Sequence, residues 1–140
     1  MFERILLAVD GSEHALRAAR QAADLARNMR SKELRVIVSY DTIPIYLGEP
    51  NMQIAYVNRK SEAEKILNDA LKEIGEIPGK LVTNVLEGDT ASRIIESAEV
   101  HKSDIIVLGS RGLGSLAGLL LGSVSQKVVA HAPCPVLIIR

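Results

Sequence analysis

The glycines and serines between residues 109 and 125 are the part of this chain whose residue types and spacing best suit chemistry. The stretch reads GSRGLGSLAGLLLGSVS. Glycine lets backbone amides approach an anion closely, and Ser123 and Ser125 stand where a helix is expected to begin. Helix N-termini attract phosphate, and serine hydroxyls add donors. The stretch therefore predicts a phosphate cradle, with Arg111 as an added cation. The alternative is a plain strand–helix connection capped by Ser123.

Two common phosphate-binding motifs are absent. The chain contains no GxxxxGK[ST], and Gly109, Gly112 and Gly114 give G-x-x-G-x-G, the reverse of the dinucleotide fingerprint. Gly114, Gly118 and Gly122 have the four-residue spacing of close helix pairs in membranes, but no long apolar segment surrounds them. The sequence supports neither a P-loop NTPase, nor a typical NAD enzyme, nor a membrane helix pair.

Short apolar segments alternate with segments of helical period along the whole chain. The expected strands are Ile5–Val9, Leu34–Tyr40, Lys80–Gly88, Asp104–Gly109 and Pro135–Ile139. The expected helices are Ser12–Met29, Gln53–Ile74, Asp89–His101 and Ser123–His131, with Ser12 and Asp89 as N-caps and Asp41–Asn51 as a long loop. This alternation predicts right-handed crossovers and a parallel, doubly wound α/β sheet.

Ligands of such sheets bind at the carboxyl ends of strands, where the strand order reverses. The loops after the first and fourth strands are then the places to search for a site. They are VDGS, which contains Asp10, and the glycine-rich stretch that begins at Gly109.

Three separated blocks resemble the universal stress protein family. The spacing Gly109-x2-Gly112-x9-Gly122-Ser123 is similar to the family's nucleotide-binding signature, and ILLAVDGSEHA, DIIVLGSRG and GSVSQKVVAHAPCPVLIIR resemble its other blocks. The resemblance covers the whole chain. It implies one domain over residues 1–140, with a five-stranded parallel sheet in the order 3-2-1-4-5, of the adenine-nucleotide α-hydrolase-like (Rossmann-like) type.

The resemblance to the ATP-binding branch of the family also implies site residues. Asp10 would face the ribose or an Mg²⁺ ion, although an Asp-Gly-Ser turn that starts a helix is the alternative for this residue. The second-strand contact with adenine falls near Tyr40, with Val38 as the neighbouring candidate. The implied ATP-binding residues are Ala8, Val9, Asp10, Val38, Tyr40, Gly109, Arg111, Gly112, Gly122, Ser123, Val124 and Ser125.

The resemblance implies a regulatory or stress-response module that binds ATP, or AMP or another adenine nucleotide, with slow hydrolysis at most. No residue is assigned a catalytic role. The family implies a homodimer paired through Pro135–Ile139, and an exposed apolar edge strand gives a physical reason for that pairing. The regulatory effect of nucleotide binding is expected to pass to a protein partner, which the sequence does not identify. Two alternatives remain open: an ATPase or nucleotidyl- or phosphoryl-transfer enzyme, and a partner-binding subunit that needs no nucleotide.

Composition limits the partners and the compartment. Lys plus Arg and Asp plus Glu number 17 each, so we expect no general attraction to nucleic acid or to an anionic membrane. The apolar runs, including the one near the N-terminus, are too short for a signal peptide or a membrane span. A single cysteine suits the reducing cytoplasm, which is the expected location.

The remaining reactive residues are expected to be structural. The histidines at 14, 101 and 131 are far apart in the sequence, and each is expected on a helix surface or at a helix end. Their separation suggests no metal cluster. Cys134 lies between two prolines beside an apolar strand and is expected to be a buried, inert thiol.

Overall fold

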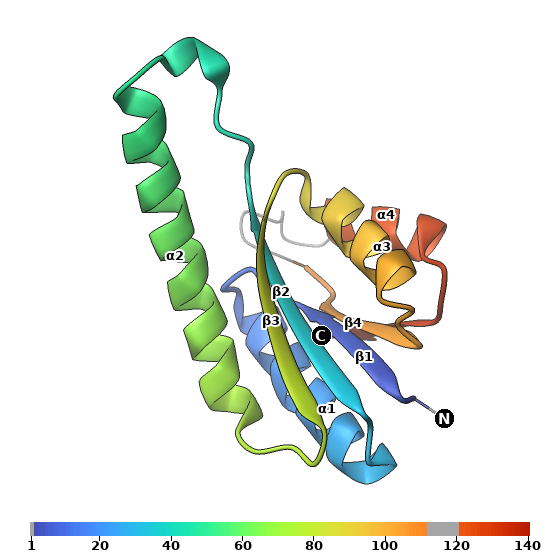
Figure 1. Ribbon diagram of the computed structural model, residues 1–140. Helices are drawn as coiled ribbons and strands as arrows, with labels where there is room; N and C mark the ends of the chain where they lie inside the picture. The colour runs from blue at the N-terminus through green and yellow to red at the C-terminus, as the bar shows by residue number, and fades with distance from the viewer. Residues whose placement is uncertain (1, 112–120) are drawn as a thin grey trace.

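The computed structural model describes residues 2–111 and 121–140. Five parallel strands form one sheet in the order β3-β2-β1-β4-β5, flanked by helices on both faces (Figure 1). The strands are β1 (Arg4–Ala8), β2 (Glu33–Tyr40), β3 (Lys80–Glu87), β4 (Ile105–Gly109) and β5 (Val136–Ile139). The helices are α1 (Glu13–Met29), α2 (Asn51–Ile74), α3 (Thr90–Val100) and α4 (Ser123–His131), with a 3₁₀ turn, η1, at Ile45–Leu47. The predicted fold class and strand order are confirmed.

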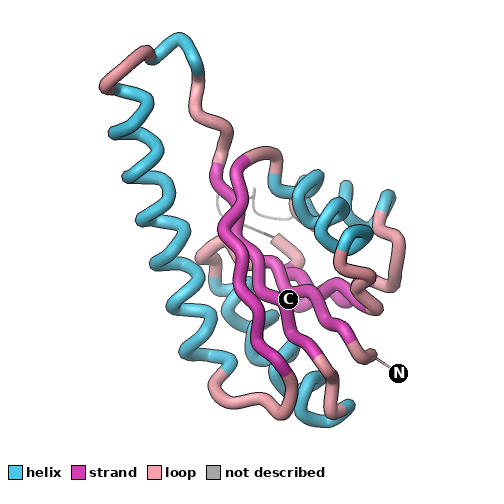
Figure 2. Tube along the Cα trace, in the orientation of Figure 1, coloured by secondary structure: helices cyan, strands magenta, loops and turns pink. Residues whose placement is uncertain are grey.

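Each face of the sheet has its own hydrophobic core, because side chains alternate along a strand. On one face, Leu7 of β1 and Val36 of β2 pack against α1 and α2. On the other face, Leu6 and Ile37 pack against α3 and α4. Figure 2 shows the two helical layers on either side of the strands.

Alanines let α1 lie close to the sheet. The buried residues of this helix are Ala15, Ala18, Ala19, Ala22, Ala23 and Ala26. A methyl side chain brings the helix backbone near the strands, and alanine also has the highest helix propensity. The close approach matters for the site, because the first turn of α1 meets the end of β4.

Most element boundaries agree with the predictions, and the differences are local. The Ser12 hydroxyl caps α1 by accepting from the Ala15 amide at 3.1 Å, and Asp89 caps α3 by accepting from the Ser92 amide at 3.0 Å. Helix α2 begins at Asn51 rather than Gln53, and the expected loop from 41 to 51 contains the η1 turn. Each strand end differs from its prediction by at most one residue. No helix within the described residues is long and apolar enough to cross a membrane.

Candidate functional site

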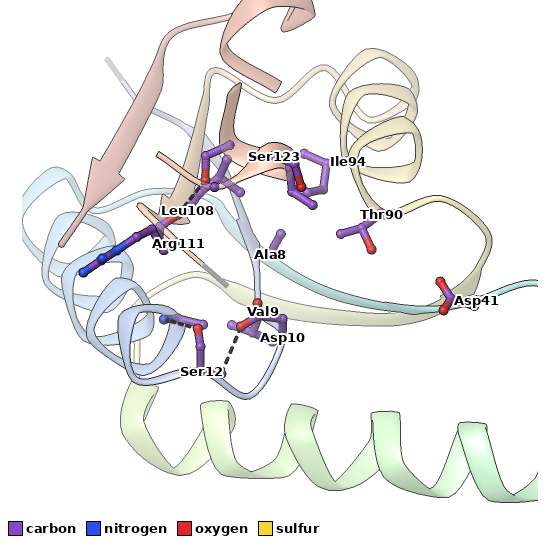
Figure 3. A pocket seen from close by; sticks show the side chains of 15 residues that line it. Ala8, Val9, Asp10, Ser12, Asp41, Thr90, Ile94, Leu108, Arg111 and Ser123 are labelled. Carbon is purple, nitrogen blue, oxygen red and sulfur yellow. Dashed lines mark hydrogen bonds between the residues drawn. The ribbon is translucent and has the colours of Figure 1, made fainter. Parts of the chain in front are cut away.

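A cavity of about 410 Å³ opens at the carboxyl ends of β1 and β4, where the strand order reverses (Figure 3). This volume lies within the range of small-molecule sites, and the position is the one where open α/β sheets bind ligands. The cavity is lined by Ala8, Val9, Asp10, Ser12, Ala15, Asp41, Thr90, Ile94, Leu108, Gly109, Arg111, Gly122, Ser123, Val124 and Ser125.

The loop after β1 places Asp10 in the wall of the cavity. The Val9 amide donates to the Ile37 carbonyl at 3.0 Å, which extends the pairing of β1 with β2 by one residue. The next residues turn sharply through Gly11, whose φ of +87° favours glycine. The carboxylate of Asp10 accepts a hydrogen bond from the Ser12 amide at 2.9 Å. Asp10 therefore both shapes the entry into α1 and lies beside the cavity.

The two ends of the glycine-rich stretch lie together in space. The Gly122 amide donates to the Ser110 carbonyl at 2.7 Å, and the Ser125 hydroxyl donates to the Gly109 carbonyl at 2.9 Å. The chain thus leaves the sheet after Gly109 and returns beside its starting point to begin α4. Gly112 lies outside the described residues. Gly109 and Gly122, at the two ends of the long spacing in the sequence, both line the cavity.

A glycine is required at position 109 because α1 lies against it. A Cβ atom there would be 2.7 Å from the His14 Cβ and 2.9 Å from the His14 carbonyl carbon. The His14 Nδ1 atom is also hydrogen-bonded to the Ser110 hydroxyl over 2.7 Å. His14 was expected on the helix surface, but it is partly buried between α1 and the glycine-rich stretch.

The N-terminus of α4 faces the cavity. Gly122 is its N-cap, with φ −72° and ψ 168°, and no side chain caps the helix. Ser123 and Val124, in the first turn, line the cavity. The first amides of a helix have no partner within the helix and carry its positive dipole end. This wall can bind a negatively charged group.

Arg111, Val38 and Tyr40 are placed differently, relative to the cavity, from the other predicted contact residues. Arg111 lines the cavity, but its guanidinium extends away from Asp10 and Thr90, over α1 (Figure 3). Val38 is 2% exposed in the core beneath α1 and α2, and Tyr40 packs against the same core. Neither Val38 nor Tyr40 is among the residues that line the cavity.

Asp41 and Thr90 line the cavity and were missed by the sequence reasoning. Alternation along β2 explains this placement, because Val38 and Tyr40 point to the α2 face while Ser39 points to the opposite face. The Ser39 hydroxyl is hydrogen-bonded to the Thr90 hydroxyl at 2.7 Å, and Thr90 is the first residue of α3. Following this alternation from the buried Val36 would have identified Ser39 and its neighbours.

Asp89 and Cys134 have shifted pKa values but do not line the cavity. Hydrogen bonds from the Ser92 hydroxyl and amide, with Lys127 as a further donor, lower the pKa of Asp89 to about 2. Burial raises the pKa of the Cys134 thiol, and the charge of Asp104 adds to this. A raised pKa disfavours the reactive thiolate, in keeping with the expected inert thiol, although Cys134 is only partly buried. Within residues 2–111 and 121–140, no group of three or more His, Cys, Asp or Glu side chains could hold a metal ion.

The fold and the cavity together define a Rossmann-like α/β protein with a cavity at the switch point of its sheet. The universal stress protein family model matches residues 1–140. A universal stress protein of Thermus aquaticus, encoded in the QAH/OAS sulfhydrylase 3' region, is 46% identical over 140 residues, which cover 100% of both chains. The chain therefore belongs to the universal stress protein family.

Solved structures agree with this assignment. The universal stress protein UspA from Lactobacillus plantarum has a TM-score of 0.87 and 26% identity, over 99% of this chain and 98% of that one. Two more distant structures share the fold at 24% and 23% identity, with TM-scores of 0.68 and 0.66. They cover 99% and 97% of this chain, and 97% and 90% of their own. The first is a universal stress protein in complex with cAMP, and the second is a family member from Arabidopsis thaliana with AMP bound.

Proposed function

We propose that this protein binds an adenine nucleotide, with ATP as the first candidate, in the cavity between β1, β4 and α4. The observation that carries the proposal is the meeting of Gly109 and Gly122 beside the uncapped N-terminus of α4. Backbone amides at a helix N-terminus and glycines without side-chain bulk suit phosphate groups. The AMP-bound and cAMP-bound relatives support an adenine nucleotide as the class of ligand.

The positions of the described residues suggest which of them contacts each part of the nucleotide. The phosphates lie against Gly122, Ser123 and Ser125, with Arg111 and Gly112 as the further expected contacts. Asp10 accepts hydrogen bonds from the ribose or contributes to an Mg²⁺ site. Magnesium commonly takes one or two carboxylates together with substrate phosphates, and a single carboxylate beside a phosphate wall fits that pattern. When bound, the ion would neutralise phosphate charge.

The proposed role is regulatory, with slow hydrolysis at most, and we assign no catalytic residue. Residues 1–140 act as one universal stress protein domain in the cytoplasm. A second copy of the chain pairs with the edge strand β5, where Leu137 is 37% exposed. The Ser110 amide donates to the Ile139 carbonyl at 2.7 Å, so the nucleotide wall contacts the proposed dimer edge directly. The effect of nucleotide binding would be transmitted through this contact to a protein partner.

Calorimetric titration with ATP and Mg²⁺ tests the proposal, alongside mass spectrometry of small molecules released from the purified protein. Gly122→Val is expected to reduce the affinity at least about tenfold, because the new side chain enters the phosphate path. Asn68→Val, on the exposed surface of α2, introduces the same side chain away from the cavity and is expected to bind normally. Absence of binding by the folded wild type, or equal affinity of Gly122→Val, would contradict the proposal.

A further inference from the structure

Residues 44–58, which we call the arm, extend beyond the carboxyl ends of the strands (Figure 1). The arm consists of η1 and the first two turns of α2, and Glu49 is its one charged residue, although 24% of the whole chain is charged. Ile45 and Tyr46 are 84% and 87% exposed, and the other exposed apolar side chains are Ile54, Tyr56 and Val57. Depletion of charge together with exposed tyrosine and aliphatic side chains is typical of the centre of a protein–protein interface.

The start of α2 is apolar on two sides. Tyr56 lies against the end of β2, where its ring centroid is 6.4 Å from that of Tyr40 in an edge-to-face arrangement. Ile54 and Val57, three residues apart, share a different side of the helix. A surface helix presents one apolar stripe to its own core, whereas a helix that is apolar all round is buried. The fold of a single chain therefore leaves the start of α2 uncovered.

Neither the cavity nor the proposed pairing through β5 involves the arm. The described residues that line the cavity include Asp41, just before the arm, but none from 44 to 58. The β5 strand is one edge of the sheet, whereas α2 packs against β2 and β3 at the other edge. The arm is thus a separate surface, and what it binds does not depend on the proposed function.

We propose that the arm binds the arm of a second copy of this chain. Its exposed apolar side chains present roughly 600 Å², compared with about 800 Å² that each partner buries in an interface of standard size. Monomeric proteins rarely leave a larger apolar patch in water. The same residues meet across a two-fold axis, so a surface with almost no charge brings no like charges together. A strongly charged partner would find no complementary charge on the arm.

Hydrogen bonds hold the arm in one shape. The Arg59 guanidinium, from α2, donates through Nη1 to the Asp41 carbonyl at 2.8 Å and to the Thr42 carbonyl at 3.1 Å. The Met52 amide donates to the Gly48 carbonyl at 2.8 Å, which joins the start of α2 to the end of η1. Little further ordering is needed on association, so more of the burial contributes to affinity.

Two interfaces on different surfaces of one chain imply a larger assembly than a dimer. Pairing through β5 and pairing through the arm each join a surface to its own copy, and the common closed assembly with two such interfaces is a D2 tetramer. The area of the arm lies near the lower end for specific interfaces. We therefore expect dimers joined through β5 to associate into tetramers only as the protein concentration rises.

Val57→Lys tests the pairing by sedimentation velocity over a concentration series without nucleotide. The lysine would be buried against the second copy without a partner, so the dissociation constant for arm pairing should rise at least about tenfold. Val100→Lys, at the exposed end of α3, makes the same chemical change elsewhere and should assemble as the wild type does. Both valines are exposed in the single chain, so both variants should fold, which circular dichroism and the melting temperature check.

The outcomes decide the inference separately from the proposed function. At high concentration the largest wild-type species should have twice the mass of the largest Val57→Lys species. Amide hydrogen exchange of residues 44–58 should slow as the wild-type concentration rises, but not in Val57→Lys. Equal assembly of Val57→Lys and the wild type overturns the inference, even if the arm then binds another protein or a lipid surface. None of these results depends on whether the folded protein binds a nucleotide.

Discussion

The hydroxyl of Ser125, in the first turns of α4, donates a hydrogen bond to the carbonyl of Gly109 at the end of β4 over 2.9 Å. The Gly122 amide reaches the Ser110 carbonyl beside it. These two bonds hold the N-terminus of α4 against the strand end. A wall fixed by hydrogen bonds within the protein binds an anion at a lower entropic cost than one that must form on binding.

The two glycines of this wall are required for different reasons, which gives the first prediction. Gly109→Ala places a methyl group 2.7 Å from the His14 Cβ and 2.9 Å from its carbonyl carbon, so the backbone of α1 must shift. We expect a loss of about 1–3 kcal/mol in the free energy of unfolding, measured by urea denaturation. Gly122→Ala is the matched control.

Gly122 has φ −72°, which any residue adopts. The loss in Gly122→Ala is therefore expected to stay below about 1 kcal/mol, mainly from a poorer N-cap. Equal destabilisation by the two changes would contradict the steric explanation for Gly109.

The contact between His14 and Ser110 gives the second prediction. It joins α1 to the glycine-rich stretch through a hydrogen bond of 2.7 Å, and Ser110 is 2% exposed. Burial protects the bond from water, so His14→Ala and Ser110→Ala should not be additive. A double-mutant cycle on urea denaturation is expected to give a coupling energy of about 0.5–1.5 kcal/mol.

A distant pair supplies the reference for this cycle. Glu99 is exposed on α3, which packs on the opposite face of the sheet from α1 and His14. His14→Ala and Glu99→Ala should add to within about 0.5 kcal/mol. A coupling near zero for His14 and Ser110 would show that their contact does not contribute to stability.

The fold could be predicted from the sequence because each element has a clear local signal. Continuous apolar runs such as IIVLG, Ile105–Gly109, indicate a strand covered on both faces, and the residues at Ser12 and Asp89 indicate helix starts. The η1 turn gave no such signal, since a single 3₁₀ turn has neither period nor cap. The ends of the strands also have no capping signal, so they could be predicted only to within one residue.

The candidate site could be predicted only in part. Asp10 and Gly122 follow directly from their loops, because strand ends of a parallel sheet meet at one edge. The sequence alone could not show which residue of β2 faces the cavity, because Val38, Ser39 and Tyr40 are all near the end of the strand. Which of them faces the site depends on the phase of the strand relative to its covering helices. Asp41 and Thr90 come together only through the tertiary contact of β2 with α3.

The pKa of Asp89 gives the third prediction. It is lowered from 3.8 to about 2, by the Ser92 hydroxyl and amide and then by Lys127. A depressed folded pKa means that the carboxylate stabilises the protein above about pH 4, and that this stability is lost as the pH falls toward 2. Its side chain is 62% exposed, so we expect about 1 kcal/mol after solvent screening.

Asp89→Asn keeps a good N-cap residue while removing the charge. Its free energy of unfolding should lie below that of the wild type at pH 5, and the gap should close between pH 4 and pH 2. Glu99→Gln, an exposed change on the same helix, is the control and should follow the wild type. Parallel curves for Asp89→Asn and the wild type would show that the charge of Asp89 does not stabilise the fold.

The two edges of the sheet give the last prediction, which tests the proposed dimer. Leu137 on β5 and Leu81 on β3 are each 37% exposed, on opposite edge strands. If a second copy pairs with β5, a charge at Leu137 would be buried without a partner, which costs several kcal/mol. Leu137→Lys should therefore be monomeric by sedimentation at concentrations where the wild type is dimeric. Leu81→Lys places the same charge on the other edge and should remain dimeric, because β3 stays in solvent. A dimer that survives Leu137→Lys but not Leu81→Lys would place the interface on β3 instead.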